Sequence, residues 1–391
     1  MCVAAISGAP RLALLCWAAL VPAATLGAQP RLCPDIARLK PNRWHKLHEQ
    51  QPGDAVRFQR QEHGGACFDT RRGRIVLFGS NTHGRDWTNS PLLFDPVERV
   101  WRRVYPDDDP KTYAVNAEGL PVAGPDGDHP WAMHTFGSVI YDPERDEMVV
   151  CCYDPHMAPG RFTNALKDLW PQVKRHPTWT FSFETQRWKP LPCPAEHFFP
   201  YCVAYDGDRR VIIGYRPGGV FELGGEPRAW KKVAPKGFFG WHTNAAYDAK
   251  SKALVVFGSN ENSNDVAAFW PATGEHRKMP TPGERPPKDQ HCPMCFEPQA
   301  GRVVVIVDRR LDEAGKKLQA ETWLYDLAAD AWTHLPSATL PFGCGMNYNL
   351  VYDPGHKACL LVTGGYGQPT AVWALRLALN APPGDSSPPS R

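Results

Sequence analysis

Several signals that would point to a familiar chemistry are missing from this chain of 391 residues. It has no glycine-rich nucleotide loop, no serine nucleophile motif of the hydrolase type and no paired-histidine helix motif of the zinc proteases. The formal net charge is only +3, which does not indicate the basic surface of a nucleic-acid-binding protein. Apolar runs of bilayer length are also missing. We therefore expect no nucleic-acid partner and no membrane span.

The N-terminal region has the features of a secretory signal. Arg11 precedes an apolar core at residues 12–21, and Ala28 places a small residue before Gln29. The pattern predicts a signal peptide at residues 1–28 and an exported protein, either periplasmic or secreted. Residues 29–42 are expected to lead into the folded domain, and the Pro/Ser-rich residues 379–391 to form a disordered tail.

Cysteine is plentiful for an exported chain. Two of the twelve cysteines lie in the predicted signal peptide, and twelve minus two leaves ten. An even number in an oxidising compartment predicts disulfide bonds, although the spacing does not give their pairing.

One pattern of short strands recurs six times along the chain. In each copy a first strand ends in an aromatic residue and an acidic one, and a basic residue and a second apolar strand follow. The acidic residues that mark the register are Asp69, Asp142, Asp206, Asp248, Glu297 and Asp353. A third strand follows, and a tryptophan opens a fourth in four copies, at Trp101, Trp188, Trp230 and Trp332. Proline, with 40 residues, has roughly twice its average share, as in a turn-rich β protein.

Four short strands repeated at roughly 50-residue intervals are typical of the blades of a β-propeller. The last copy lacks a fourth strand, but residues 44–47, before the first copy, match the fourth-strand pattern. The sequence therefore predicts an all-β fold over residues 43–378: a six-bladed propeller closed by an N-terminal strand, which leaves no exposed sheet edge.

The repeats resemble the kelch family, the superfamily that includes the central domain of galactose oxidase. The resemblance is carried by Gly364 and Gly365, by the aromatic–acidic turns and by the spaced tryptophans, although only the last copy has the double glycine. It implies a kelch-type β-propeller. We do not expect a copper-radical oxidase, because those enzymes have a larger ring and draw a copper ligand from a further domain.

Two insertions interrupt the repeats, at residues 106–131 and 154–177. Long insertions in a compact repeat fold often act as lids or binding loops, and surface decoration is the alternative. Residues 162–170 are expected to form one or two helical turns.

Histidines recur at one position of the repeat. Counting back six residues from each acidic mark gives His63, Phe136, Pro200, His242, His291 and Asn347. These positions should surround one mouth of the central channel, with His134 on the same side of its strand as Phe136. We expect His63, His242 and His291 to bind a divalent metal. Two alternatives are direct contact with a ligand, including proton transfer, and hydrogen bonding to the backbone of a neighbouring blade.

Polar and aromatic side chains gather in the loops on that face. The predicted ligand-binding residues are Asn81, Asp86, Trp87, Asn260, Arg309, Asn347 and Tyr366. His134, Arg85 and Tyr153 are the predicted catalytic residues. This mixture suits a sugar, particularly an acidic one, because arginine grips carboxylates and aromatic rings stack on sugar faces.

Two functions are compatible with this pattern. The first is an enzyme that acts on a carbohydrate or another small acidic ligand. The layout resembles kelch-type sialic-acid mutarotases and propeller polysaccharide lyases, and this likeness implies metal binding or proton transfer by the three histidines and a carboxylate clamp at Arg85. The second is a non-catalytic binding or scaffold protein, since a fold does not fix a function. The sequence does not indicate an oligomeric state.

Overall fold

A computed structural model describes residues 31–56, 63–82, 86–151, 166–193, 200–237, 239–261, 263–311, 318–344, 346, 348–365 and 368–379. The predicted signal peptide, most of the predicted C-terminal tail and the first part of the second insertion lie outside these ranges. Within them the regular secondary structure is almost entirely β, as predicted.

The strands form six four-stranded antiparallel sheets within the described ranges, which we number in chain order. Sheet 1 contains β2 (Gly65–Asp69), β3 (Arg74–Phe78), β4 (Leu92–Asp95) and β5 (Val100–Arg103). Sheet 2 contains β9 (Val139–Asp142), β10 (Glu147–Val150), β11 (Thr178–Ser182) and β12 (Arg187–Leu191). Sheet 3 contains β13 (Cys202–Asp206), β14 (Val211–Arg216), β15 (Gly219–Gly224) and β16 (Ala229–Ala234).

The second half of the chain repeats this order. Sheet 4 contains β17 (Asn244–Asp248), β18 (Ala253–Phe257), β19 (Val266–Trp270) and β20 (Glu275–Met279). Sheet 5 contains β21 (Met294–Glu297), β22 (Arg302–Arg310), β23 (Leu318–Asp326) and β24 (Ala331–His334). Sheet 6 contains β25 (Asn349–Asp353), β26 (Ala358–Gly365) and β27 (Gln368–Leu375), and its fourth strand is β1 (Trp44–Glu49).

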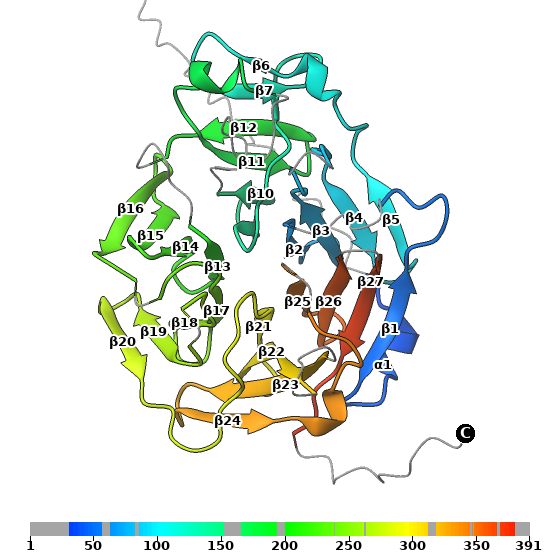
Figure 1. The fold of residues 1–391 in the computed structure, drawn as a ribbon, viewed down its shortest axis with the longest axis vertical. Helices are drawn as coiled ribbons and strands as arrows, with labels where there is room; N and C mark the ends of the chain where they lie inside the picture. The colour runs from blue at the N-terminus through cyan, green and yellow to red at the C-terminus, as the bar shows by residue number, and fades with distance from the viewer. Residues whose placement is uncertain are drawn as a thin grey trace, which may run out of the picture.

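The six sheets are arranged around a common centre (Figure 1). The first strand of each sheet contacts the first strands of both neighbouring sheets, in the cyclic order β2, β9, β13, β17, β21, β25 and back to β2. The outer strands β5, β12, β16, β20, β24 and β1 lie at the periphery (Figure 1). This arrangement is typical of a β-propeller.

The N-terminal strand completes the last sheet, as predicted. β1 pairs antiparallel with β27, with Trp44 opposite Leu375 and Glu49 opposite Ala371. The preceding helix α1 (Pro34–Ala37) is tied to the same sheet, because the Cys33 N–H donates to His356 Nε2 at 2.7 Å. The first and last described strands are thus held in one sheet.

The acidic register residues stabilise the turns that connect the first and second strands of each sheet. Each of the six is at most 2% exposed, and its side chain accepts backbone N–H groups two or three residues further on at 2.5–3.3 Å. A carboxylate is strongly favoured here, because it satisfies turn N–H groups, two of them in five of the six turns.

Repeated tryptophans join several sheets to the one before, whereas sheet 4 has His276 at this position. Trp188 of sheet 2 packs on Phe78 of sheet 1 at a ring distance of 4.9 Å. Trp230 of sheet 3 donates its indole N–H to Thr178 of sheet 2 at 2.9 Å. In the same way Trp44 of sheet 6 donates to Thr322 of sheet 5 at 2.9 Å. The cores therefore lie between neighbouring sheets.

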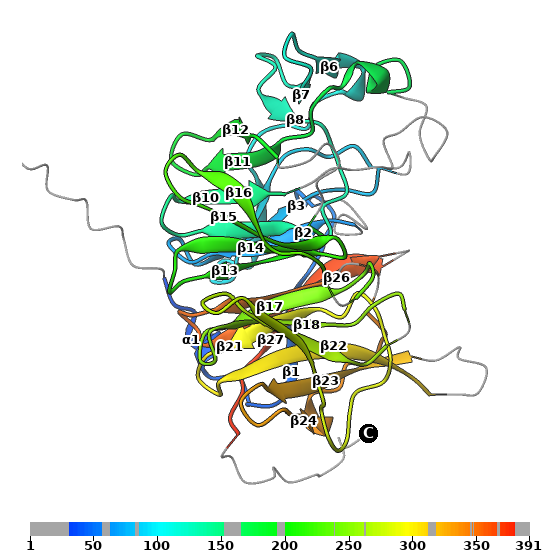
Figure 2. The ribbon, with the colours of Figure 1, turned by 90° about the vertical axis from the view of Figure 1, so that its left-hand side faces the viewer.

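The two insertions pack against each other beside the ring (Figure 2). The first contains the short helix η1 (Pro110–Thr112) and a three-stranded sheet of β6 (Ala114–Val115), β7 (Pro121–Ala123) and β8 (His129–Pro130). The described part of the second contains a turn and the short helix η3 (Trp170–Gln172). Tyr113, Trp131 and Leu166 are buried together between the insertions, so the insertions form one satellite unit. Another short helix, η4 (Pro336–Ala338), follows β24.

Replacement of a turn-locking carboxylate tests this account of the fold. Asp248→Ala removes the acceptor for the N–H groups of Lys250 and Ser251, and we expect a loss of about 1–3 kcal/mol in the free energy of unfolding. Asp248→Asn keeps one acceptor oxygen and should lose less. Urea unfolding measures both variants, and an Asp248→Ala variant as stable as the wild type would show that the turn does not depend on this side chain.

Candidate functional site

The site lies where the chain enters the first strands. His63, Phe136, His242 and His291 occupy equivalent positions there, and all four have positive φ, at 63°, 48°, 64° and 55°. The turn lets the His63 carbonyl accept the Phe136 N–H at 3.2 Å, and the His242 carbonyl accept the His291 N–H at 2.9 Å. A left-handed backbone is unfavourable for residues other than glycine and costs on the order of 1 kcal/mol. The two hydrogen bonds show that residues at this position link one sheet to the next, and the left-handed backbone recurs with this role.

The histidine rings form two stacked pairs. His63 stacks on His134 with ring centroids 4.2 Å apart, and His242 stacks on His291, also at 4.2 Å. Phe136 and Tyr201 connect the pairs: Phe136 lies 5.5 Å from His63 and 4.8 Å from Tyr201, which lies 5.5 Å from His242. We call these six residues the ring arc. The structure therefore brings the predicted histidines together two by two, in an arc that runs past the starts of sheets 1 to 5.

Most of the ring arc is buried. His63, His134, Phe136, Tyr201 and His291 are at most 6% exposed, whereas His242 is half-buried. His134 Nε2 accepts the Thr82 N–H at 3.1 Å, so the neutral ring carries its proton on Nδ1. His134, a predicted catalytic residue, thus holds a loop and has no surface for a ligand.

The geometry does not fit the predicted metal site. No group of three or more His, Cys, Asp or Glu side chains in the described part of the chain is placed to hold an ion. The nitrogen lone pairs of imidazole lie in the ring plane, so rings stacked face to face do not direct two donors at one ion between them. The metal therefore has no place in the function proposed below.

The other predicted residues have different surroundings. Arg85, Tyr153, Asn347 and Tyr366 lie outside the described residues. Asn81 is buried, Asp86 accepts the Thr88 N–H at 3.0 Å, and Trp87 packs against the satellite unit. Arg309 pairs with Glu321 at 2.9 Å on the neighbouring strand. Asn260 is exposed beside Trp241, whose carbonyl accepts its N–H at 3.0 Å.

The exposed part of the mouth lies on sheets 4 and 5. Trp241 is 39% exposed, and its ring lies 6.0 Å from Tyr201. His242 Nδ1 and the side-chain oxygen of the exposed Gln290 are 2.6 Å apart. The exposed mouth, as we call it, consists of Trp241, His242, Asn260, Gln290, Asp289, Asp308 and Arg310.

Two carboxyl groups in the exposed mouth were not among the predicted site residues. Asp289 accepts the Asp308 N–H at 2.9 Å, and Asp308 accepts the Cys344 N–H at 2.6 Å. Burial raises the pKa of both carboxyl groups. The pKa of Asp308 rises to about 7, because burial and the nearby Asp289 charge outweigh the hydrogen bond from the Cys344 N–H, which lowers it. Their position in the repeat could have indicated them. Asp308 directly follows the apolar run 303–307, and Asp289 lies two residues before His291.

The predicted disulfide bonds are wrong for the described cysteines, which are all free thiols. Cys295 and Cys359 come close, with 3.6 Å between their sulfur atoms, but a disulfide needs about 2.05 Å. Most of these cysteines face the interior, where a thiol packs as a small apolar side chain.

Comparisons with known proteins assign no family. No protein-family model matches the chain, and no curated protein sequence matches it. None of the helices in the described part of the chain is long and apolar enough to cross a membrane.

The raised pKa of Asp308 makes stability depend on pH. Unfolded Asp308 ionises near its ordinary pKa of 3.8, and the folded residue near 7. The folded state therefore binds more protons between these values, and the wild type loses stability as the pH rises through this window.

Asp308→Asn should remove this loss. At pH 8.5 we expect the variant to be more stable than the wild type by on the order of 1–2 kcal/mol, after allowing for partial exposure. At pH 4 the two proteins should be nearly equal. Urea unfolding at both pH values measures the difference, and a difference that is the same at both would contradict the assignment.

Proposed function

We propose that the chain is an exported six-bladed kelch-type propeller that binds a carbohydrate at the exposed mouth. Each four-stranded sheet corresponds to one blade, and β1 provides the fourth strand of the last blade. The apolar core at residues 12–21 supports export. The alternative is a non-catalytic scaffold, which the burial of most of the ring arc favours.

One observation carries the binding proposal: the exposed Trp241 lies next to the polar residues Asn260 and His242 at the exposed mouth. Trp241 is 39% exposed and is bonded through its carbonyl to exposed Asn260. An indole face stacks on the C–H face of a sugar, and polar groups around it bind the hydroxyls.

The charges favour a neutral sugar over an acidic one. Arg310 would attract a carboxylate, but Asp289 and Asp308 belong to the same surface and would repel it. Arg309 is already paired with Glu321. The structure thus supports the carbohydrate part of the expectation better than the acidic-ligand part.

An epimerase or lyase reaction here would need a proton donor and acceptor that reach the ligand. Asp308, with a pKa of about 7, and the half-buried His242 are groups of this kind in the exposed mouth. His134 is buried, so the proton-transfer part of the proposal rests on these two residues.

Trp241→Ala tests the proposal. After a glycan array identifies a saccharide, calorimetry should show affinity at least 10-fold weaker for this variant, because a stacking face is lost. The matched control is Trp270→Ala, which removes a tryptophan at the end of β19, on the opposite face of the ring, where it packs on Arg277; its affinity should be unchanged. If no saccharide binds, or if both variants bind like the wild type, the scaffold alternative replaces the proposal.

A further inference from the structure

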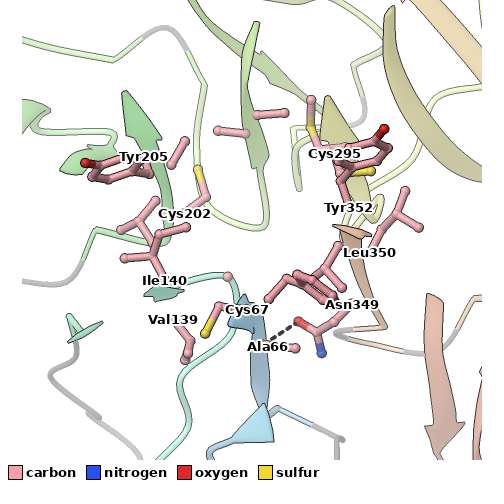
Figure 3. Close-up of a pocket in the computed structure, with 18 of the residues that line it drawn as sticks. Ala66, Cys67, Val139, Ile140, Cys202, Tyr205, Cys295, Asn349, Leu350 and Tyr352 are labelled. Carbon is pink, nitrogen blue, oxygen red and sulfur yellow. Dashed lines mark hydrogen bonds between the residues drawn. The ribbon is translucent and has the colours of Figure 1, made fainter. Parts of the chain in front are cut away.

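A cavity runs along the axis of the ring, apart from the exposed mouth. Residues of the first strand of every sheet line it, and its volume is about 320 Å³. Small-molecule sites typically have ~300–1,000 Å³, so the cavity has room for a compact ligand. Figure 3 shows these side chains surrounding the space from several strands.

The lining is mainly apolar and carries no charge among the described residues. Ala66, Val139, Ile140, Ala246 and Leu350 contribute aliphatic surface. Three buried thiols, Cys67, Cys202 and Cys295, also border the space. A charged ligand would lose its hydration without gaining an opposite charge, so the chemistry selects a neutral molecule.

Two asparagines at the mouth end of the cavity, Asn244 and Asn349, do not indicate a polar ligand. Asn349 accepts the Ala66 N–H at 3.1 Å and donates to the Gly64 carbonyl at 3.0 Å, so it joins sheets 6 and 1. The Asn244 amide donates to the Cys292 carbonyl at 2.5 Å and joins sheets 4 and 5. These amides are used to hold the ring together.

Aromatic residues surround the other end of the cavity. They are the residues that precede the acidic turn marks: Phe68, Tyr141, Tyr205, Tyr247, Phe296 and Tyr352. The Tyr141 hydroxyl donates to Asp146 at 2.8 Å, and in Figure 3 the hydroxyls of Tyr205 and Tyr352 point away from the centre. The cavity is therefore bordered here by ring carbons and not by hydroxyls.

We propose that this cavity binds a neutral, largely apolar small molecule, which enters between the aromatic residues on the turn side. The ring arc places buried side chains from the starts of sheets 1 to 5 at the opposite mouth, which favours entry from the turn side. A sugar would bury hydroxyls without partners here, so this site and the carbohydrate site have different ligands.

Nile red, a neutral planar dye, is the probe. We expect saturable binding to the full chain with one dye per protein, and affinity at least 10-fold weaker in Ala246→Phe and Ala204→Leu, which fill the cavity from two different sheets. The control Ala272→Phe, in the exposed turn between β19 and β20, should bind like the wild type. Binding that does not saturate, or that both folded cavity variants retain, would overturn the proposal.

A second readout needs no cavity variant. Bound dye should slow maleimide labelling of Cys67, Cys202 and Cys295 in the wild type, measured by peptide mass spectrometry. Labelling of Cys193, which does not line the cavity, should keep its rate. Equal rates with and without dye at all four thiols would refute the site even if the substituted chains did not fold.

Discussion

The pairing of β1 with β27 is the interaction on which the other features depend. The six four-stranded sheets form a closed circle of contacts, and β1, the first described strand, completes the last sheet of this circle. Closure fixes the circle of contacts among the six first strands, and this circle creates both the axial cavity and the mouth. A strand edge left open at sheet 6 would also expose unpaired backbone groups.

Residues that recur in the repeat stabilise the ring, and residues that depart from the repeat form its accessible polar surface. The acidic turn locks and the bridging tryptophans recur around the circle and are buried. The stacked histidines partly belong to this framework, because their left-handed backbone passes hydrogen bonds from sheet to sheet. Trp241, Gln290 and the Asp289–Asp308 pair occur on sheets 4 and 5 only, and they make one side of the mouth accessible and polar.

Much of the fold could be predicted because its signals are local. The aromatic–acidic turn, the apolar second strand and the tryptophan lie within one repeat, and Trp44 identified the closing strand. The site could be predicted only in part. Repeat position placed His63, His242 and His291 at the mouth, but ring orientation depends on how adjacent sheets approach, and this approach produced stacked pairs in place of a metal site. The free thiols have the same cause, since distances between sheets are not encoded in the spacing of cysteines.

Hydrogen exchange on a chain that begins at Gln51, compared with the full chain, tests ring closure most directly. Removal of β1 leaves β27 without its outer partner and releases the contact of Trp44 with Thr322. We predict that amide protection falls in β26 and β27, and also in β2 and β21, the first strands of the two neighbouring sheets, which contact β25. Unchanged protection in β2 and β21 would contradict the account, because it would mean that the sheets hold their places without a closed circle.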